Sequence, residues 1–354
     1  MKEQFLTYME DNHLDGFYIS NPVNVRYLSG FTGEDSSLYI TNGRAYFITD
    51  LRYTEQAAIE CPDFEIVNWR ESGKDMGDTI AYLTEKQQVK TLGFESTHIT
   101  FDTYSAIQQK LAVELIPQTG VIENIRSVKS SEEIKYLRAA CDIASCAFDK
   151  ICKDIRVGIT EKEIASRLSH YMVMEGADTK PYGGIVISGA RTSLLHGIPS
   201  GKAIEYGDFV LMDYGCQFKG YLSDMTRTVV VGRADNRQKE VYKLEQQMVA
   251  EVEAVLRPGI TCNEAYEASL KAIADTEYMQ YHYSGIGHGV GLFVHEPPFM
   301  GPGGKSVIKA NQVITVEPGL YIPGWGGVRI EDQVLITGNG CENLISATKE
   351  LVEL

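Results

Sequence analysis

Basic side chains are scarce in this chain of 354 residues. Its 33 lysines and arginines stand against 48 aspartates and glutamates, which gives a formal net charge of −15 at pH 7. A protein that binds nucleic acid or an anionic membrane needs a positively charged face to neutralise phosphate groups. The charge balance therefore argues against both partners, and it raises the question of whether some acidic residues are grouped in one place.

Cysteines are also few, and long apolar runs are missing. The seven cysteines are scattered without a C-x-x-C pair, which indicates reduced thiols in a cytoplasmic protein and excludes a disulfide framework or a zinc knot. No 18 consecutive apolar residues occur, so we expect no membrane-spanning helix. The first sixteen residues carry acidic side chains where a secretory signal needs an apolar stretch, so we expect no signal peptide.

The length and the hydrophobic content of 44% predict two globular domains. In the first part, short apolar or β-branched runs alternate with helical stretches such as 52–60 and 101–112. These runs are FYIS (17–20), LYIT (38–41), RAYFIT (44–49), FEIVNW (64–69), TLGFES (91–96) and VELIP (113–117). We expect a compact α/β domain over residues 1–125 and a second domain over 126–354, whose first helix would be capped by Ser131.

The second part contains a weak internal repeat. IRVGITEKEI (155–164) and LRPGITCNEA (256–265) share Arg, Gly, Ile, Thr and Glu in the same register. Each segment follows a long helical stretch that its glycine could end, and each threonine could cap the next helix. The repeat favours a duplicated α+β unit whose halves face each other across a pseudo-twofold axis, with a site between them. The alternative is the common sequence pattern of a helix–turn–helix.

Two predicted β-hairpins each carry two acidic residues. The first, at 207–232, has strands in FVLMDY and SDMTRTVVV. A turn centred between residues 218 and 219 would place Asp213 directly opposite Asp224, with Cβ atoms roughly 5 Å apart. Opposed like charges within apolar strands are costly unless a cation lies between them.

The second hairpin, at 313–337, repeats this arrangement around a Pro/Gly-rich turn centred near Gly324. Its register would place Glu317 opposite Glu331, again at the ends of apolar runs. Two such pairs in the halves of a duplication predict a cluster of four carboxylates, and carboxylate oxygens are the ligands that hard divalent cations prefer. One imidazole ligand would shift the preference towards Mn, Co, Fe or Zn.

Candidate nitrogen ligands lie in the glycine-rich segment 281–298, which contains three histidines. His288 lies between two glycines that would let the backbone approach a site closely, and His295 follows the apolar run GLFV. Three histidines in one short segment, together with a carboxylate cluster that lacks a nitrogen ligand, favour a metal site over a purely structural role.

In their local sequences these residues resemble one family. MDYGCQFKGYLSDMTRT, GIGHGVGLFVHE, TVEPGLY and GVRIED are similar to the motifs of the proline-specific pita-bread metallopeptidases, which comprise Xaa-Pro aminopeptidases and prolidases. NPVNVRYLSGFTG and ITDLRYTEQA resemble the smaller N-terminal domain of that family. The resemblance implies an α/β creatinase-like N-terminal domain followed by a duplicated, pseudo-twofold α+β pita-bread catalytic domain.

The resemblance also implies two divalent metal ions per chain, with Mn(II) as the expected metal and Co(II), Fe(II) or Zn(II) as alternatives. Asp213 would bind one ion and His288 the other. Asp224 and Glu331 would bridge both ions, and Glu317 would complete the shell of the second.

Three further residues match family positions that hold substrate and stabilise the transition state. They are His196 in SLLHGIPS, His295 in FVHE and Arg329 in GVRIED. Glu317 would also accept and return a proton, because a metal-bound carboxylate lies close to the attacking water. One departure is Ser284, which stands where the family usually has His or Ala, four residues before the ligand histidine.

The activity implied is hydrolysis of the peptide bond between an N-terminal residue and a following proline, by a hydroxide that bridges two metal ions. We expect an Xaa-Pro aminopeptidase that acts as a homodimer on small peptides with proline in second position. An Xaa-Pro dipeptidase, or prolidase, is the main alternative. A methionine aminopeptidase shares the ligands but matches the N-terminal domain and the Arg329 motif less well. Two further alternatives fit less well. A creatine amidinohydrolase lacks the full set of metal ligands, which this chain has, and a non-catalytic protein of the same fold would have no need to keep that set.

Overall fold

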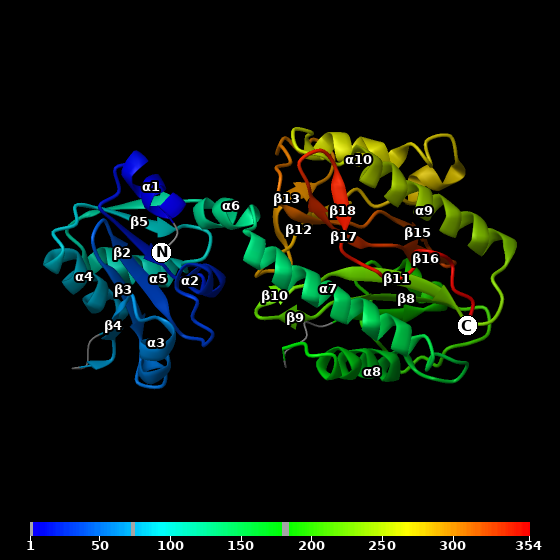
Figure 1. Ribbon diagram of the computed structural model, residues 1–354, viewed down its shortest axis with the longest axis horizontal. Coiled ribbons are helices and arrows are strands. Elements are labelled where there is room, and N and C mark those ends of the chain that lie inside the picture. Colours follow the sequence, from blue (N-terminus) through cyan, green and yellow to red (C-terminus); the bar gives the residue numbers. More distant parts are fainter. Residues whose placement is uncertain (1–2, 72–74, 179–183) are drawn as a thin grey trace. The chain divides into compact units, whose positions relative to one another are not determined.

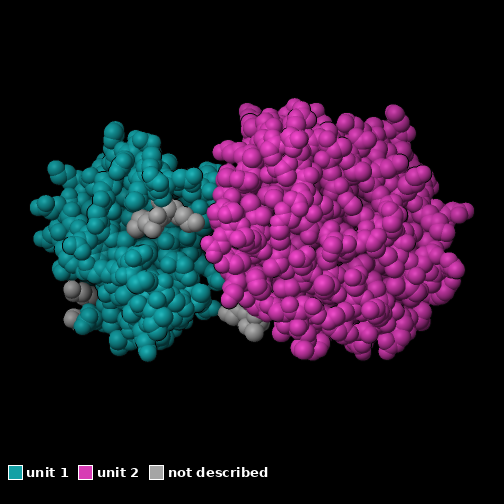
Figure 2. All heavy atoms as spheres, in the orientation of Figure 1, with its two compact units in different colours: residues 1–126 teal, residues 127–354 magenta. Residues whose placement is uncertain are grey.

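The computed structural model describes residues 3–71, 75–178 and 184–354. The chain forms two compact units, Met1–Arg126 and Ser127–Leu354 (Figures 1 and 2). This division falls one residue after the boundary expected from the sequence. Within the described residues, no helix combines the length and the apolar character that a membrane crossing requires. All seven cysteines carry free thiols.

The first unit is built on a six-stranded sheet with the spatial order β4-β3-β2-β1-β5-β6. Strand β2 is antiparallel to both of its neighbours, and the remaining pairs are parallel. The strands are β1 (Gly16–Ile19), β2 (Ser37–Thr41), β3 (Ala45–Thr49), β4 (Glu65–Asn68), β5 (Thr91–Glu95) and β6 (Glu114–Gln118). Each of the six predicted runs contains one of these strands almost completely, so the α/β prediction is confirmed.

Helices cover both faces of this sheet. They are α1 (Glu3–Asp11), α2 (Pro22–Ser29), α3 (Thr54–Glu60), α4 (Met76–Lys86), α5 (Phe101–Lys110) and α6 (Val121–Ser127). Successive side chains on a strand point to opposite faces. Accordingly, Phe17 and Ile19 pack in one core with α1, α2 and α3, whereas Tyr18 packs in the other with α4 and α5. The two helical stretches predicted at 52–60 and 101–112 are α3 and α5.

The second unit contains two similar halves. Its helices are α7 (Ser131–Ile151), α8 (Glu161–Met174), α9 (Asn236–Val255) and α10 (Cys262–Leu270). One sheet has the order β11-β8-β7 and the other β13-β12-β14-β17-β18. The strands are β7 (Ile185–Ser188), β8 (Phe209–Tyr214), β11 (Met225–Val230), β12 (Gly287–Gly289), β13 (Glu296–Met300), β14 (Val313–Val316), β17 (Asp332–Ile336) and β18 (Cys341–Asn343). In Figure 1, α8 and α10 lie on opposite sides of these strands.

The predicted repeat is found in matching turns between the helices of each half. Thr160 caps α8 and Thr261 caps α10, each in a capping box with a glutamate three residues later. Gly158 and Gly259 have φ angles of 91° and 97°, which glycine adopts without steric cost. They do not end α7 and α9 as expected, because both helices stop earlier. The cap of α7 is Ser130 rather than Ser131, because Glu133 completes a capping box with Ser130.

The first acidic hairpin has a different register from the predicted one. Asp213 on β8 pairs with Thr226 on β11, two residues beyond Asp224. The short strands β9 (Gln217–Phe218) and β10 (Tyr221–Leu222) close the hairpin, and both turn residues, Lys219 and Gly220, have positive φ. This is a type I′ turn, centred one position later than predicted. The resulting shift by two residues leaves every side chain on its expected face.

The register of the second hairpin is confirmed. Val316 pairs with Asp332, and the inner strands β15 (Gly319–Ile322) and β16 (Gly326–Arg329) continue in the same register. Pairing is interrupted between the outer and inner strands, and Glu317 and Glu331 lie in this interruption. Both carboxylates therefore project from a break in the ladder and not from its regular part.

Replacing Gly220 by alanine should lower the free energy of unfolding by about 1 kcal/mol, because a Cβ atom is disfavoured at positive φ. Urea unfolding of both proteins would measure the difference. Gly201→Ala is a matched control, since Gly201 has open space around it and no left-handed φ. Equal stability of Gly220→Ala and Gly201→Ala would contradict the turn assignment.

Candidate metal centre

A cavity of about 290 Å³ in the second unit is lined by all eight predicted site residues. They are His196, Asp213, Asp224, His288, His295, Glu317, Arg329 and Glu331. Among the described residues, five more line it: Ile185, Leu195, Tyr283, Val294 and Tyr321. From the sequence, these five residues were only apolar or aromatic positions in strands or loops. Nothing distinguished them from other residues of that kind, so they were not predicted as part of the site.

The carboxylates reach the cavity from the ends of four strands. Asp213 lies on β8, Asp224 directly precedes β11, Glu317 follows β14 and Glu331 precedes β17. Each pair of acids therefore comes from one hairpin, at or beside the place where regular pairing stops. The two halves of the unit contribute two carboxylates each, as the repeat predicts.

Three of these residues converge on one point. Asp224, His288 and Glu331 each offer a ligand atom within 4.8 Å of the other two. His288 Nε2 is 3.7 Å from Asp224 Oδ2 and 3.2 Å from Glu317 Oε1. His288 Nδ1 lies 3.1 Å from the Gly289 carbonyl oxygen. This contact orients the ring so that Nε2 faces the carboxylates, as metal-binding histidines are commonly oriented.

The negative charge of the cluster is only partly balanced by protein cations. Burial and the neighbouring charge of Asp224 raise the pKa of Glu331 well above its ordinary value. Burial lowers the pKa of His288, but the hydrogen bond and the charge of Glu317 outweigh it and raise the pKa to about 9. Carboxylates and an imidazole that share a buried space in this way are a donor set suited to a divalent cation.

Arg329 is the second cation of the cavity, and it is buried. Its Nη2 donates to Asp213 Oδ2 at 2.5 Å, and its Nη1 donates to the Tyr321 hydroxyl at 2.6 Å. Burial raises the pKa of Asp213, although Arg329 opposes this effect. Arg329 therefore contacts a predicted ligand carboxylate directly.

Thr226 connects the two hairpins, and sequence reasoning missed it. Its carbonyl oxygen accepts from Glu331 N, and its Oγ1 donates to Glu331 Oε2 at 2.7 Å. Arg329 Nε donates to the same Oγ1 at 3.1 Å. The one available signal was its position two residues after Asp224, which places both side chains on one strand face.

The remaining histidines have different surroundings. His295 lies against His288 with ring centroids 4.5 Å apart, and burial together with His288 lowers its pKa. His196 belongs to the segment that follows the 3₁₀ turn Gly189–Ser193. The buried Glu161 anchors this segment, because its two oxygens accept from the backbone and side chain of Ser188 and of Ser200.

Comparison with known proteins identifies the family. The model of metallopeptidase family M24 matches residues 135–338, and that of the creatinase/prolidase N-terminal domain matches residues 2–128. The chain belongs to metallopeptidase family M24. It is thus a proline-specific pita-bread metallopeptidase with a creatinase-type N-terminal domain, as the sequence motifs predict. Peptidases of this family use divalent metal ions, and the Asp224–His288–Glu331 cluster is a place where this chain could hold one.

Individual relatives cover nearly the whole chain. An Xaa-Pro dipeptidase of Pyrococcus furiosus is 35% identical over 99% of both chains. The structure of an Xaa-Pro dipeptidase from Bacillus anthracis has a TM-score of 0.95 and 37% identity, covering 99% of this chain and 98% of that one. The structure of an X-Pro aminopeptidase from Thermotoga maritima has a TM-score of 0.90 and 32% identity, with coverage of 98% and 100%.

Replacing Thr226 by valine should destabilise the metal-free protein by about 1–3 kcal/mol, because the buried Glu331 and Arg329 both lose a hydrogen-bond partner. Chemical unfolding after chelation would measure this. Thr226→Ser keeps the hydroxyl and serves as the control, with a smaller loss. If the two variants unfolded alike, the hydroxyl would not be the link between the hairpins.

Proposed function

We propose that this M24 peptidase is an Xaa-Pro dipeptidase, or prolidase, which cleaves dipeptides whose second residue is proline. The observation that carries the proposal is the cavity that unites four carboxylates, His288 and Arg329 within one M24 fold. Two relatives that cover nearly the whole chain are Xaa-Pro dipeptidases, which favours the dipeptidase over the aminopeptidase expected from the sequence. The aminopeptidase, which acts on longer peptides, becomes the second candidate, supported by the Thermotoga maritima structure.

We further propose that Asp213, Asp224, His288, Glu317 and Glu331 hold two divalent metal ions, with Mn(II) preferred. The excess of buried carboxylates over protein cations supports this, because the protein groups alone leave negative charge uncompensated in the cavity. Bound ions would lower the pKa of a water molecule and polarise the scissile carbonyl group. From the same family resemblance we propose that the chain acts as a homodimer, which sedimentation analysis would test.

The protein residues would supply proton transfer and orientation. Glu317 hydrogen-bonds to His288, so its carboxylate has a defined place beside the water, where it can accept a proton and return it to the leaving nitrogen. Neutral His295 can donate a hydrogen bond to the oxyanion that forms at the scissile carbonyl. The proline nitrogen carries no hydrogen in the substrate amide, so this returned proton is required for its departure as an amine.

His196 and Arg329 would position groups on either side of the bond. His196 lines the cavity from a segment anchored by Glu161, which lets it hold the substrate near its scissile bond. Arg329 is engaged by Asp213 and Tyr321, so we assign it to orientation of the Asp213 carboxylate. Its buried hydrogen bonds to Tyr321 and Thr226 would hold the guanidinium in place beside that carboxylate.

The choice between the two peptidase activities is testable with two substrates. We expect the metal-loaded protein to hydrolyse Ala-Pro at least about a hundredfold more efficiently, by kcat/KM, than Ala-Pro-Ala. A site that binds the free carboxylate of the dipeptide would leave one buried charge unpaired when the tripeptide binds, and a cost of this kind produces a preference of that size. Amino-acid release measured by chromatography would give both values. Comparable values would favour the aminopeptidase, and no hydrolysis of either peptide would contradict both proposals.

Two substitutions separate metal binding from transition-state stabilisation. Asp224→Asn should lose metal and most activity, because one of the carboxylates that would hold the ions is removed. His295→Ala should lower kcat by about 10²–10³-fold while its metal content stays at the wild-type level. Metal content by mass spectrometry and kcat on Ala-Pro measure both effects. Loss of metal from His295→Ala would instead make His295 a ligand.

A further inference from the structure

The first unit contains a pocket of its own, with a volume of about 310 Å³. It lies where several strands of the six-stranded sheet end. Ser20 follows β1, Asp50 follows β3, and Trp69 and Arg70 follow β4, while Ser37 begins the antiparallel β2. Open α/β sheets bind their ligands in crevices outside the carboxyl ends of the strands. The position of the pocket in the sheet is therefore that of a ligand site.

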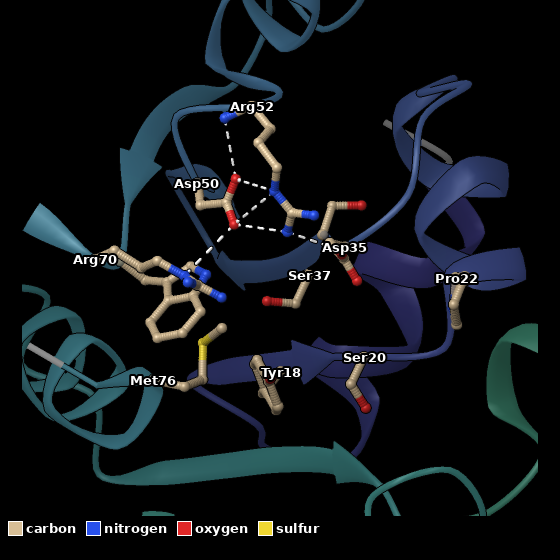
Figure 3. Close-up of a pocket in the computed structure, with 11 residues that line it drawn as sticks. Tyr18, Ser20, Pro22, Asp35, Ser37, Asp50, Arg52, Arg70 and Met76 are labelled. Atoms are coloured by element: carbon tan, nitrogen blue, oxygen red, sulfur yellow. Dashed lines mark hydrogen bonds and ion pairs between the residues drawn. The ribbon is translucent and has the colours of Figure 1, made fainter.

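One wall of this pocket is a fixed network of charges (Figure 3). Arg52 Nε and Nη2 donate to Asp50 at 3.0 Å and 2.8 Å, and Arg52 Nη2 also donates to Asp35 Oδ2 at 2.8 Å. The Asp50 side chain is buried, and the hydrogen bonds from Arg52 hold its pKa at about 2. Both carboxylate oxygens of Asp50 thus accept hydrogen bonds from Arg52, and this ion pair holds the wall of the pocket in place.

Other polar groups of the pocket keep hydrogen-bonding capacity. The Arg70 guanidinium lies 4.6 Å from the centre of the Trp69 ring, and its Nε is 3.5 Å from Asp50 Oδ2. Its two Nη groups contact no acceptor among the described residues. The Ser37 Oγ is buried beside the Tyr18 hydroxyl without a hydrogen bond of standard geometry, and Figure 3 shows it pointing into the pocket.

The charges and the walls together define a class of ligand. Two arginines and two aspartates line the pocket, so their formal charges cancel and a polyanion such as a nucleotide would gain no net attraction. Arg70 with Ser37 can bind a carboxylate, and the Asp35 oxygen that Arg52 leaves free can accept from an ammonium group. Trp69, Tyr18 and Met76 add apolar surface to the lining of the pocket.

We propose that this pocket binds a small zwitterion, a free amino acid or a dipeptide, at a site separate from the catalytic cavity of the second unit. The volume lies at the lower end of the range of about 300–1,000 Å³ for small-molecule sites, which suits a ligand of this size. The assignment rests on the pocket alone and not on the proposed dipeptidase activity, although amino acids are also products of any peptidase reaction.

The two tryptophans of the chain, Trp69 and Trp325, make a direct test possible. Trp325 packs in the second unit against Phe209, so the full-length Trp325→Phe protein keeps Trp69 as its single reporter. After chelation of metal, titration with L-proline, L-leucine or Gly-Pro should change Trp69 fluorescence saturably. Acetate and methylammonium each offer only one charged end, so they should bind at least about tenfold more weakly than the zwitterions. No saturable response to any zwitterion would overturn the proposal, and an equal response to acetate would reduce the site to a simple anion site.

Substitutions locate the binding. In the Trp325→Phe background, Arg70→Gln and Asp35→Asn should each weaken binding of the best amino acid about tenfold, measured by calorimetry so that the change near Trp69 does not interfere. Arg44→Gln is the matched control, because Arg44 is exposed in the same unit and lies outside the pocket. Unchanged affinity in both pocket variants would place the ligand elsewhere and contradict the inference. Hydrolysis of Ala-Pro is measured independently, so failure of one proposal leaves the other intact.

Discussion

The second unit depends on the balance of buried charge where its two halves meet. Thr226 bonds to Glu331, and the next residue on each strand forms a second link, because Arg227 Nη2 donates to Asp332 Oδ1 at 2.7 Å. Both members of this ion pair are fully buried, and Asp332 also pairs with Lys349 Nζ at 2.7 Å. Removing Asp332 would leave the Arg227 guanidinium in the interior without a carboxylate partner. The halves are therefore joined by two adjacent polar contacts, one of which holds Glu331, a residue of the cavity lining.

This link also explains why the cavity can collect carboxylates that repel one another. Strands held in a fixed register cannot move apart to relieve the repulsion, so the charge must be compensated in place. Arg329 pairs with Asp213, and His288 Nε2 lies 3.2 Å from Glu317 and 3.7 Å from Asp224, so two cationic groups face four carboxylates. A rigid protein frame that leaves negative charge uncompensated is well prepared for divalent cations and pays no reorganisation cost when they bind.

The cavity of the second unit and the pocket that contains Trp69 in the first unit differ in this respect. In the cavity of the second unit, carboxylates outnumber the cationic groups, whereas the pocket beside Trp69 has equal numbers of aspartates and arginines. A cavity with excess negative charge selects cations, and a pocket with balanced, separated charges suits a ligand that carries both signs. The family motifs contain all the charged residues of the first site, but of the second they contain Asp50 and Arg52 and not Asp35 or Arg70. The second comes from residues on several strands whose spacing follows no recognised pattern.

The sequence predictions are accurate where the structure depends on interactions between residues close in the sequence, and less accurate where it depends on residues far apart. The six strands of the first unit were predictable, since β-branched and aromatic runs favour strands locally. The second hairpin was placed correctly because its turn contains Gly324, which has a φ of 76°. The first was placed two residues out of register, because its type I′ turn requires a positive φ at Lys219, a conformation that lysine seldom adopts.

The sequence by itself determined the kinds of site residues, their order and the strand faces that carry them, because the strand period and the motifs are local properties. Only the tertiary structure decided which atoms meet. Thr226 hydrogen-bonds to Glu331, which lies 105 residues further along the chain, and Arg329 hydrogen-bonds to Asp213, which lies 116 residues earlier. Contacts of such separation depend on how whole sheets and helices pack, and no local propensity encodes them. The same holds for the charge-balanced pocket of the first unit, whose parts come together only when the strand ends are aligned.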